Sequence, residues 1–164
     1  MFFCLISSGV YAQETKSVSN QFIIDGRVNN HITFSLKDAK DFRTISIDSF
    51  VIYNHMHERK RALKNIKGIL LTDLLKKAGI DETNVKLFSE YYFTCVAVDG
   101  YKVVFSWNEI FNTEIGNHII IVTEEDGLNG EAMPDRIALL SAMDYSTGRR
   151  YVKGLQKIIV DRVK

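Results

Sequence analysis

The sequence predicts a single α+β domain in which strands predominate. Its 164 residues amount to about one domain, since typical domains contain roughly 100 to 150 residues. Short apolar or alternating runs recur between turn signals along the whole chain, and only two or three stretches have helical spacing. Strands and helices do not alternate regularly, as a parallel sheet with crossover helices would require. We therefore expect mixed sheets with a few short helices.

The first twelve residues, MFFCLISSGVYA, carry no charged side chain and end in the small residue Ala12. They resemble the apolar part and cleavage site of a secretory signal peptide without its basic start. Cleavage there would leave Gln13 first, followed by a flexible lead-in over 13–20 and one domain over 21–164. A buried N-terminal strand is the alternative. No other run approaches the roughly 20 apolar residues of a membrane span, so we expect a periplasmic or secreted protein with no stable membrane span.

Strands and turns alternate in the first third of the chain. Two β-type runs, 22–28 and 31–36, flank an Asn-Asn pair and predict a hairpin. Residues 35–38 have the S-x-x-D pattern of a capping box, which predicts a short helical turn. Apolar and polar residues alternate over 44–53, as expected of a half-buried strand.

The clearest helix and the strongest hairpin follow. Apolar residues recur at helical spacing over 70–78, and Gly79 stands where a left-handed residue would end the helix. The runs 91–98 and 101–105 flank an Asp-Gly pair, which predicts a hairpin with a two-residue turn. A second capping box predicts a short helix over 106–111. The remaining predicted strands are 118–123, 136–140 and 155–160.

Composition and missing motifs exclude several function classes. Lys and Arg number 21 against 20 Asp and Glu, so the chain lacks the basic excess of non-specific nucleic-acid binding, and we expect no nucleic-acid partner. Two cysteines, Cys4 and Cys95, are too few for a disulfide scaffold or a multi-Cys zinc site. There is no Gly-rich phosphate loop, G-x-S-x-G or H-E-x-x-H motif. His55 and His57 would share one face of a strand, but two imidazoles are insufficient for a closed metal site, so we predict none.

Two clusters of basic residues stand out in this nearly neutral chain. Within 55–67 the only acid is Glu58, and the second cluster comprises Arg149, Arg150 and Lys153. Arg and Lys side chains bind phosphate and other oxyanions. The clusters therefore indicate an anionic small-molecule ligand, and strand edges that carry charge into solvent are the alternative. We place Tyr101, directly after the Asp-Gly pair, near the mouth of a pocket.

Five motifs, in order, resemble the molybdopterin-binding domain of the sulfite-oxidase type. They are FSLKD at 34–38, KGILLTDLLKKAGI at 67–80, DGY at 99–101, PDR at 134–136 and GRRYVKGLQKIIV at 148–160. The resemblance extends from about residue 22 to 162 and implies the mixed, largely β, molybdopterin-binding fold of these oxidoreductases. It implies that basic side chains contact the phosphate of a pterin cofactor. On this basis we expect Arg136, Arg150 and Lys153 to bind the ligand. Asn54, His55 and His57 would line the other side of the site, and Tyr101 completes the expected site residues at its mouth.

The sequence departs from the family's pattern at the metal ligand. The family holds molybdenum through a Cys thiolate in a C-x-x-N pattern, and here Val51 stands at the thiolate position before Asn54. Valine cannot coordinate a metal, and Cys95 lies far along the sequence. We therefore expect a pterin or related anionic ligand without the usual oxo-transfer at molybdenum, and assign no catalytic residue. Two functions stay open: a pterin-dependent oxidoreductase with a redox partner protein, and a non-catalytic binding or interaction module that kept the fold and lost the cofactor.

These expectations include a geometric one. Segment 54–57, Arg150 and Lys153 should converge on one concave pocket if they bind a ligand, and should point to separate solvated faces if they do not. If Arg150 and Lys153 serve the ligand rather than the fold, replacing both by alanine should leave thermal stability nearly unchanged.

Overall fold

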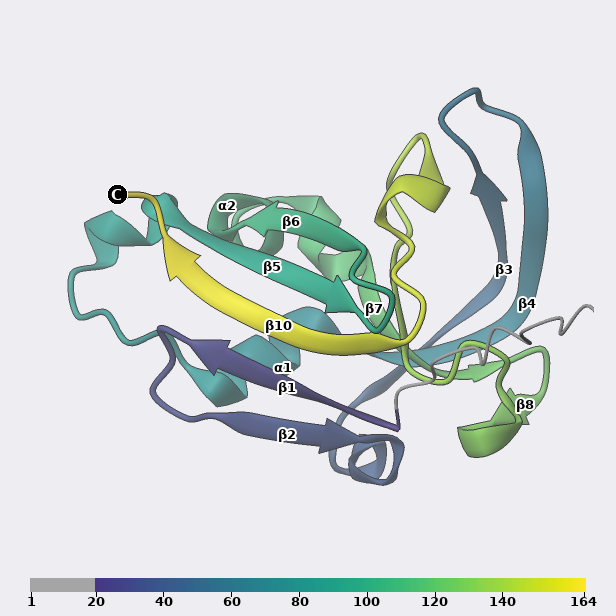
Figure 1. The fold of residues 1–164 in the computed structure, drawn as a ribbon, viewed down its shortest axis with the longest axis horizontal. Coiled ribbons are helices and arrows are strands. Elements are labelled where there is room, and N and C mark those ends of the chain that lie inside the picture. The colour runs from purple at the N-terminus through teal and green to yellow at the C-terminus, as the bar shows by residue number, and fades with distance from the viewer. Residues whose placement is uncertain (1–19) are drawn as a thin grey trace, which may run out of the picture.

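A computed structural model describes residues 20–164 of the chain (Figure 1). The expected signal segment 1–12 and nearly all of the lead-in lie outside the described residues. The strands are β1 (Gln21–Gly26), β2 (Ile32–Ser35), β3 (Thr44–Tyr53), β4 (Arg59–Leu70), β5 (Tyr91–Ala97), β6 (Lys102–Ser106), β7 (Ile119–Glu125), β8 (Leu128–Asn129), β9 (Ala138–Ser141) and β10 (Leu155–Arg162). The α-helices are α1 (Leu71–Ala78) and α2 (Trp107–Phe111), and the 3₁₀ turns are η1 (Leu36–Asp41), η2 (Val85–Glu90), η3 (Glu114–His118), η4 (Gly130–Ala132) and η5 (Thr147–Arg150). This is the mainly β, α+β architecture that the sequence predicts.

The first sheet has the strand order β2-β1-β10-β5-β6, and β10 lies at its centre. β1 and β10 run parallel, with Ile24 opposite Ile158, whereas the other neighbouring strands are antiparallel. In Figure 1 the helices α1 and α2 lie behind this sheet. Alternate residues of β5 are buried, from Tyr91 through Phe93 and Cys95, because they face the main core beneath the helices.

The second sheet has the order β3-β4-β7-β8, and β9 also pairs with β7. Its long β3–β4 hairpin extends away from the rest of the domain (Figure 1). Phe50 pairs with Leu63 near the middle of the hairpin, and both belong to a second core cluster with Leu140 and Tyr151. The basic stretch 55–67 is thus the tip of this hairpin and most of β4.

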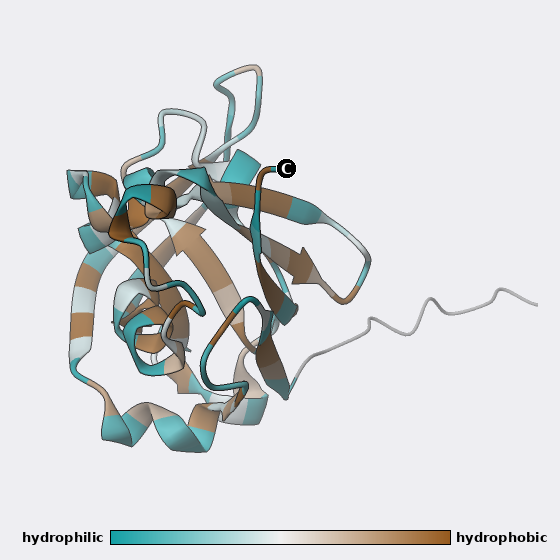
Figure 2. Cartoon of the chain, turned by 90° about the vertical axis from the view of Figure 1, so that its left-hand side faces the viewer, coloured by the Kyte–Doolittle hydropathy of each residue, from teal (hydrophilic) through white to brown (hydrophobic). Residues whose placement is uncertain are grey.

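Local signals in the sequence account for several element boundaries. The carboxylate of Asp38 accepts from the backbone N–H of Ser35 at 2.7 Å, and the Ser106 hydroxyl accepts from the N–H of Glu109 at 3.1 Å, so both capping boxes form. Helix α1 ends before Gly79, whose φ is 66°. Figure 2 shows apolar residues concentrated in the strands and hydrophilic residues in many of the loops.

The predicted two-residue turn between β5 and β6 is wrong. The N–H of Ala97 donates to the carbonyl of Tyr101 at 2.8 Å, so three residues, 98–100, form the loop. Gly100 has a φ of 85°, and the Asp99 carboxylate accepts from the Tyr101 N–H at 2.9 Å. A three-residue loop needs one left-handed residue, which glycine supplies, whereas the predicted turn needs two.

No described helix is both long and apolar enough to cross a membrane.

Candidate ligand-binding pocket

A pocket of about 340 Å³ lies between the far end of the β3–β4 hairpin, the β5–β6 loop and η5. Its apolar or small lining residues are Ile52, Tyr101, Gly148 and Tyr151, and its polar ones are Asn54, His55, Lys60, Arg61, Arg149 and Lys153. The volume is at the lower end of the range of small-molecule sites, which are typically largely apolar with a few placed polar groups. We call this cavity the basic pocket.

The basic pocket brings together four of the seven expected site residues. Asn54, His55, Tyr101 and Lys153 line it, so the hairpin tip and the second basic cluster do converge. The lining does not include His57, Arg136 or Arg150. Arg149 lines the pocket, where the sequence analysis places its neighbour Arg150.

Several contacts fix η5 against the hairpin. The Thr147 hydroxyl donates to the carbonyl of Val51 at 2.7 Å and accepts from the N–H of Tyr53 at 2.9 Å. At Gly148 a Cβ atom would lie 2.8 Å from the carbonyl oxygen of Tyr53, so only glycine allows this close approach. The Tyr101 hydroxyl donates to the carbonyl of Arg149 at 2.5 Å. The backbone that carries Arg149 is therefore bound to β3 on one side of the pocket and to Tyr101, beside the β5–β6 loop, on the other.

The buried carboxylate of Asp135 organises one wall of the pocket. Its Oδ2 atom lies 3.2 Å from the Tyr151 hydroxyl, 3.5 Å from Arg61 and 3.9 Å from the Lys153 ammonium. Arg61 also pairs with the buried carboxylate of Glu125. Burial and the charge of Asp135 raise the pKa of Tyr151, so its phenol stays protonated and donates to Asp135.

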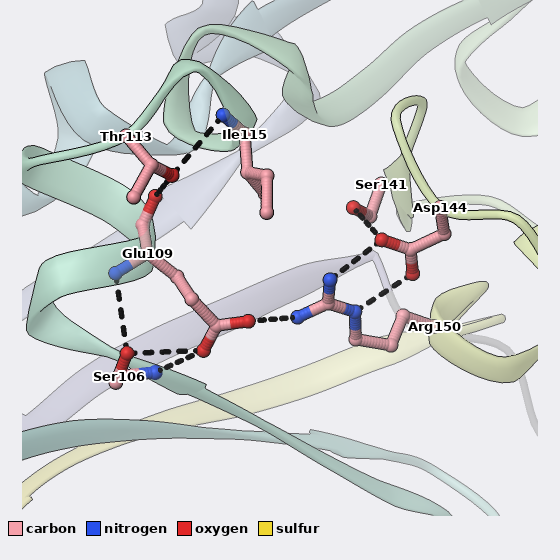
Figure 3. Close-up of polar contacts among 7 residues, drawn as sticks. All are labelled: Ser106, Glu109, Thr113, Ile115, Ser141, Asp144 and Arg150. Carbon is pink, nitrogen blue, oxygen red and sulfur yellow. Dashed lines mark hydrogen bonds and ion pairs between the residues drawn. The ribbon is translucent and has the colours of Figure 1, made fainter.

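Arg150 is held in an ion-pair network outside the pocket (Figure 3). Its guanidinium donates to both carboxylate oxygens of Asp144, at 2.7 and 2.5 Å, and to Glu109 at 2.8 Å. It also lies over the ring of Phe105, 4.4 Å from the centroid. The hydrogen bonds to Asp144, opposed by burial and aided by Glu109, raise the pKa of Arg150. Arg150 thus joins α2, the 142–146 loop and η5, and its structural role differs from the ligand contact expected from the sequence.

The remaining two expected residues lie elsewhere. Arg136 has a left-handed φ of 53° and lines a second pocket with Ser35, Lys37 and Glu131. His57, with a φ of 57°, lies at the exposed hairpin tip, where its N–H donates to the carbonyl of Asn54 at 3.0 Å.

Seven residues that line or border the basic pocket are not among the expected site residues: Ile52, Lys60, Arg61, Gly148, Arg149 and Tyr151 line it, and Asp135 forms ion pairs with its cationic side chains. Lys60, Arg61 and Arg149 belong to the two basic clusters of the sequence, and Gly148 and Tyr151 lie within the closing motif, but none of them has an assigned role there. Asp135 lies inside the PDR motif, in which the resemblance assigns the ligand contact to Arg136. One feature of the sequence could have indicated that Asp135 is buried: it lies shortly before the apolar strand that begins at Ala138.

The residues present do not fit a thiolate-held molybdenum centre. Val51, which the sequence resemblance places at the family's ligand position, has no side-chain atom that can bind a metal, and its backbone carbonyl accepts from the Thr147 hydroxyl. Cys95 is fully buried in the main core, where desolvation raises the pKa of its thiol to about 12. Within residues 20–164 no cluster of three or more His, Cys, Asp or Glu side chains is placed to hold a metal ion. The cationic side chains of the pocket, by contrast, do fit the anionic part of a pterin or a related ligand.

Because Cys95 is buried and its thiol stays protonated, we expect it to resist alkylation in the folded protein. Iodoacetamide at pH 8 should modify Cys95 at least about 100-fold more slowly than in protein unfolded in guanidinium, since the thiolate is the reactive form. Mass spectrometry of the peptide that contains Cys95 measures this rate. Rapid modification under native conditions would contradict the placement of Cys95 in the core.

Comparison with known proteins adds a distant structural likeness. No family model matches the sequence, and no curated protein matches it. The fold is similar to the crystal structure of the sulfane dehydrogenase SoxCD from Paracoccus pantotrophus, with a TM-score of 0.58 and 12% identity. The match covers 85% of this chain and 37% of that one, so the chain spans well under half of its structural neighbour. At this identity the likeness shows that the two proteins share a fold.

Proposed function

We propose that the protein binds a small organic anion, such as a pterin cofactor or a related ligand, in the basic pocket. The observation that carries the proposal is the placement of Arg149 and Lys153 beside apolar and aromatic side chains in one cavity. Arg149 forms no ion pair within the described part of the chain, and Lys153 lies 3.9 Å from its nearest carboxylate oxygen, that of Asp135. Both cations can therefore turn to an incoming anion.

The residues at the expected metal position favour binding without thiolate-ligated molybdenum. A valine stands where the family's thiolate would be, and the only cysteine in residues 20–164 is buried in another part of the fold. We therefore propose a ligand-binding module rather than a molybdenum oxo-transferase. Metal and pterin analysis of protein purified from its native host tests this choice: stoichiometric molybdenum would contradict it, and a bound pterin or other organic anion without molybdenum would support it.

Export to the periplasm or the medium is part of the proposal and rests on the uncharged first twelve residues. Cell fractionation followed by N-terminal sequencing tests it. Mature protein that begins at Gln13 outside the cytoplasm would support export, and a cytoplasmic protein that retains Phe2 would contradict it.

Replacement of both Arg149 and Lys153 by alanine should weaken anion binding. We expect the affinity for 6-carboxypterin, measured by isothermal titration calorimetry, to fall at least about tenfold, because each charge-assisted hydrogen bond contributes roughly 1.5–3 kcal/mol. Both residues are exposed, so the melting temperature should change by less than about 2 °C.

A matched control replaces Arg43 and Lys86, which are exposed and are not part of the pocket lining, by alanine. This control removes the same two charges and should leave the affinity within about twofold of wild type if the pocket, rather than net charge, binds the ligand. Equal weakening in the two double variants would contradict the proposed site.

A further inference from the structure

Charges nearly cancel around the basic pocket. Four lining side chains are cationic: Lys60, Arg61, Arg149 and Lys153. Three carboxylates form ion pairs with them: Glu58 with Lys60 at 2.9 Å, Glu125 with Arg61, and Asp135 with both Arg61 and Lys153. Within the described residues, this leaves an excess of one positive charge around the pocket, and Arg149 is the cation without an ion-pair partner.

The two inner carboxylates differ from ordinary surface acids in their burial. The side chains of Asp135 and Glu125 are 2% and 4% exposed, whereas Glu58 is 53% exposed. Water screens the exposed pair strongly and the buried carboxylates weakly. Lys153 shares Oδ2 of Asp135, so an anion that contacts Lys153 comes within a few ångströms of a buried negative charge. The first negative charge of a ligand can pair with Arg149. A second negative charge would have no unpaired cation left, because the other three cations already pair with carboxylates.

We infer that the basic pocket selects a ligand whose anionic group carries one negative charge. This inference rests on the proposed function and narrows it. Among the organic anions proposed there, the pocket takes a carboxylate, sulfonate or phosphodiester attached to a flat apolar or aromatic body, and disfavours a pterin or other ligand that carries a phosphate monoester. Ile52, Tyr101 and Tyr151 supply the apolar surface for that body. Asp135 is the residue that sets the selectivity, since it offsets the cations from a buried position.

Two probes with the same ring separate charge from shape. Benzenesulfonate carries one negative charge, and phenyl phosphate carries nearly two at pH 8, because the second pKa of a phosphate monoester is about 6. Titration of the ¹⁵N-labelled protein at low salt, followed at the amide signals of Gly148 and Arg149, gives both dissociation constants. We expect benzenesulfonate to bind about tenfold more tightly, the ratio that corresponds to about 1.4 kcal/mol.

Removal of a carboxylate should reduce this preference. Asp135→Asn keeps an acceptor for the Tyr151 hydroxyl and adds one net positive charge. The ratio of the dissociation constant of phenyl phosphate to that of benzenesulfonate should therefore fall several-fold. Glu58→Gln adds the same charge at an exposed position, so it tests the idea with little risk to folding, and its shift should be in the same direction but smaller. Glu131→Gln, 85% exposed and in the second pocket, is the matched control and should leave the ratio unchanged.

The outcomes distinguish this inference from the proposed function. Tighter binding of benzenesulfonate by wild type, with a reduced preference in Asp135→Asn or Glu58→Gln, supports selection of a single charge. Equal or tighter binding of phenyl phosphate by wild type overturns the single-charge selectivity but not the anion pocket. The same conclusion follows if the ratio of the two dissociation constants is unchanged in every folded variant. If neither probe shifts the signals of Gly148 and Arg149, the proposed function itself fails.

Discussion

Arg150→Ala should lower the free energy of unfolding by about 3 kcal/mol, because it removes one partner from a largely buried ion-pair network. Asp144 is 11% exposed and would keep its negative charge with only the Ser141 hydroxyl as a side-chain donor among the described residues (Figure 3). Glu109 would lose its 2.8 Å contact with the guanidinium. Urea denaturation followed by circular dichroism measures the change.

The neighbouring Arg149→Ala variant is the control for Arg150→Ala. Arg149 is exposed and has no ion-pair partner among the described residues, so its replacement should change the free energy of unfolding by less than about 0.5 kcal/mol. A variant of Arg150 as stable as that of Arg149 would contradict the network. This expectation reverses the one drawn from sequence, in which Arg150 serves the ligand and stability stays nearly unchanged.

The same network gives stability a defined pH dependence. Burial acts to raise the pKa of Glu109, but hydrogen bonds from the Ser106 backbone and from Arg150 outweigh it and lower the pKa. A carboxylate with a lowered pKa in the folded protein stabilises it above the pKa of the unfolded chain, and this stabilisation is lost as the pH falls below about 4. Arg150→Ala should therefore flatten the fall in stability on acidification, which urea midpoints between pH 3 and 6 would show.

Gly68→Ala should destabilise the protein by more than about 4 kcal/mol or prevent folding, since overlap with a backbone atom leaves no room to relax. A Cβ atom at Gly68 would overlap the carbonyl oxygen of Ile121 and the side chain of Ile120. These atoms belong to β7, which pairs with β4 at this point beside a register shift. The new methyl group would force the two central strands of the second sheet apart.

Lys67→Ala introduces the same residue one position earlier in the same strand. Lys67 is exposed and pairs with Glu124 at 2.9 Å, so its loss should cost less than about 1 kcal/mol. Thermal melts of the two variants provide the comparison. Similar melting temperatures would show that β4 and β7 adjust to a side chain at Gly68, contrary to their close contact.

Elements governed by neighbouring residues were predictable from the sequence. The S-x-x-D and S-x-x-E patterns form their capping boxes, and the leucine spacing before Gly79 gives α1, because each depends on contacts within a few residues. The β5–β6 hairpin was predicted with its strand ends within one residue of those observed and its loop one residue short, since an Asp-Gly pair fits both loop types.

The division of labour between Arg149 and Arg150 was not predictable. Adjacent in the sequence, they leave η5 toward different surroundings, and the acids that hold Arg150 come from α2 and from the 142–146 loop. The role of Asp135 depends likewise on Arg61 and Lys153, which reach it from separate strands and loops. Composition shows how many charges a chain has, but only the tertiary fold decides which of them neutralise one another.

The central position of β10 has a consequence for how the chain folds. The hairpins β1–β2 and β5–β6 join residues close in sequence, but only β10 connects them into one sheet, and its partner β1 lies at the opposite end of the described chain. Contacts between residues so distant in sequence form slowly, because a long loop must close first. During synthesis the two hairpins must wait for residues 155–162, so the first sheet closes in a late step that inserts its middle strand.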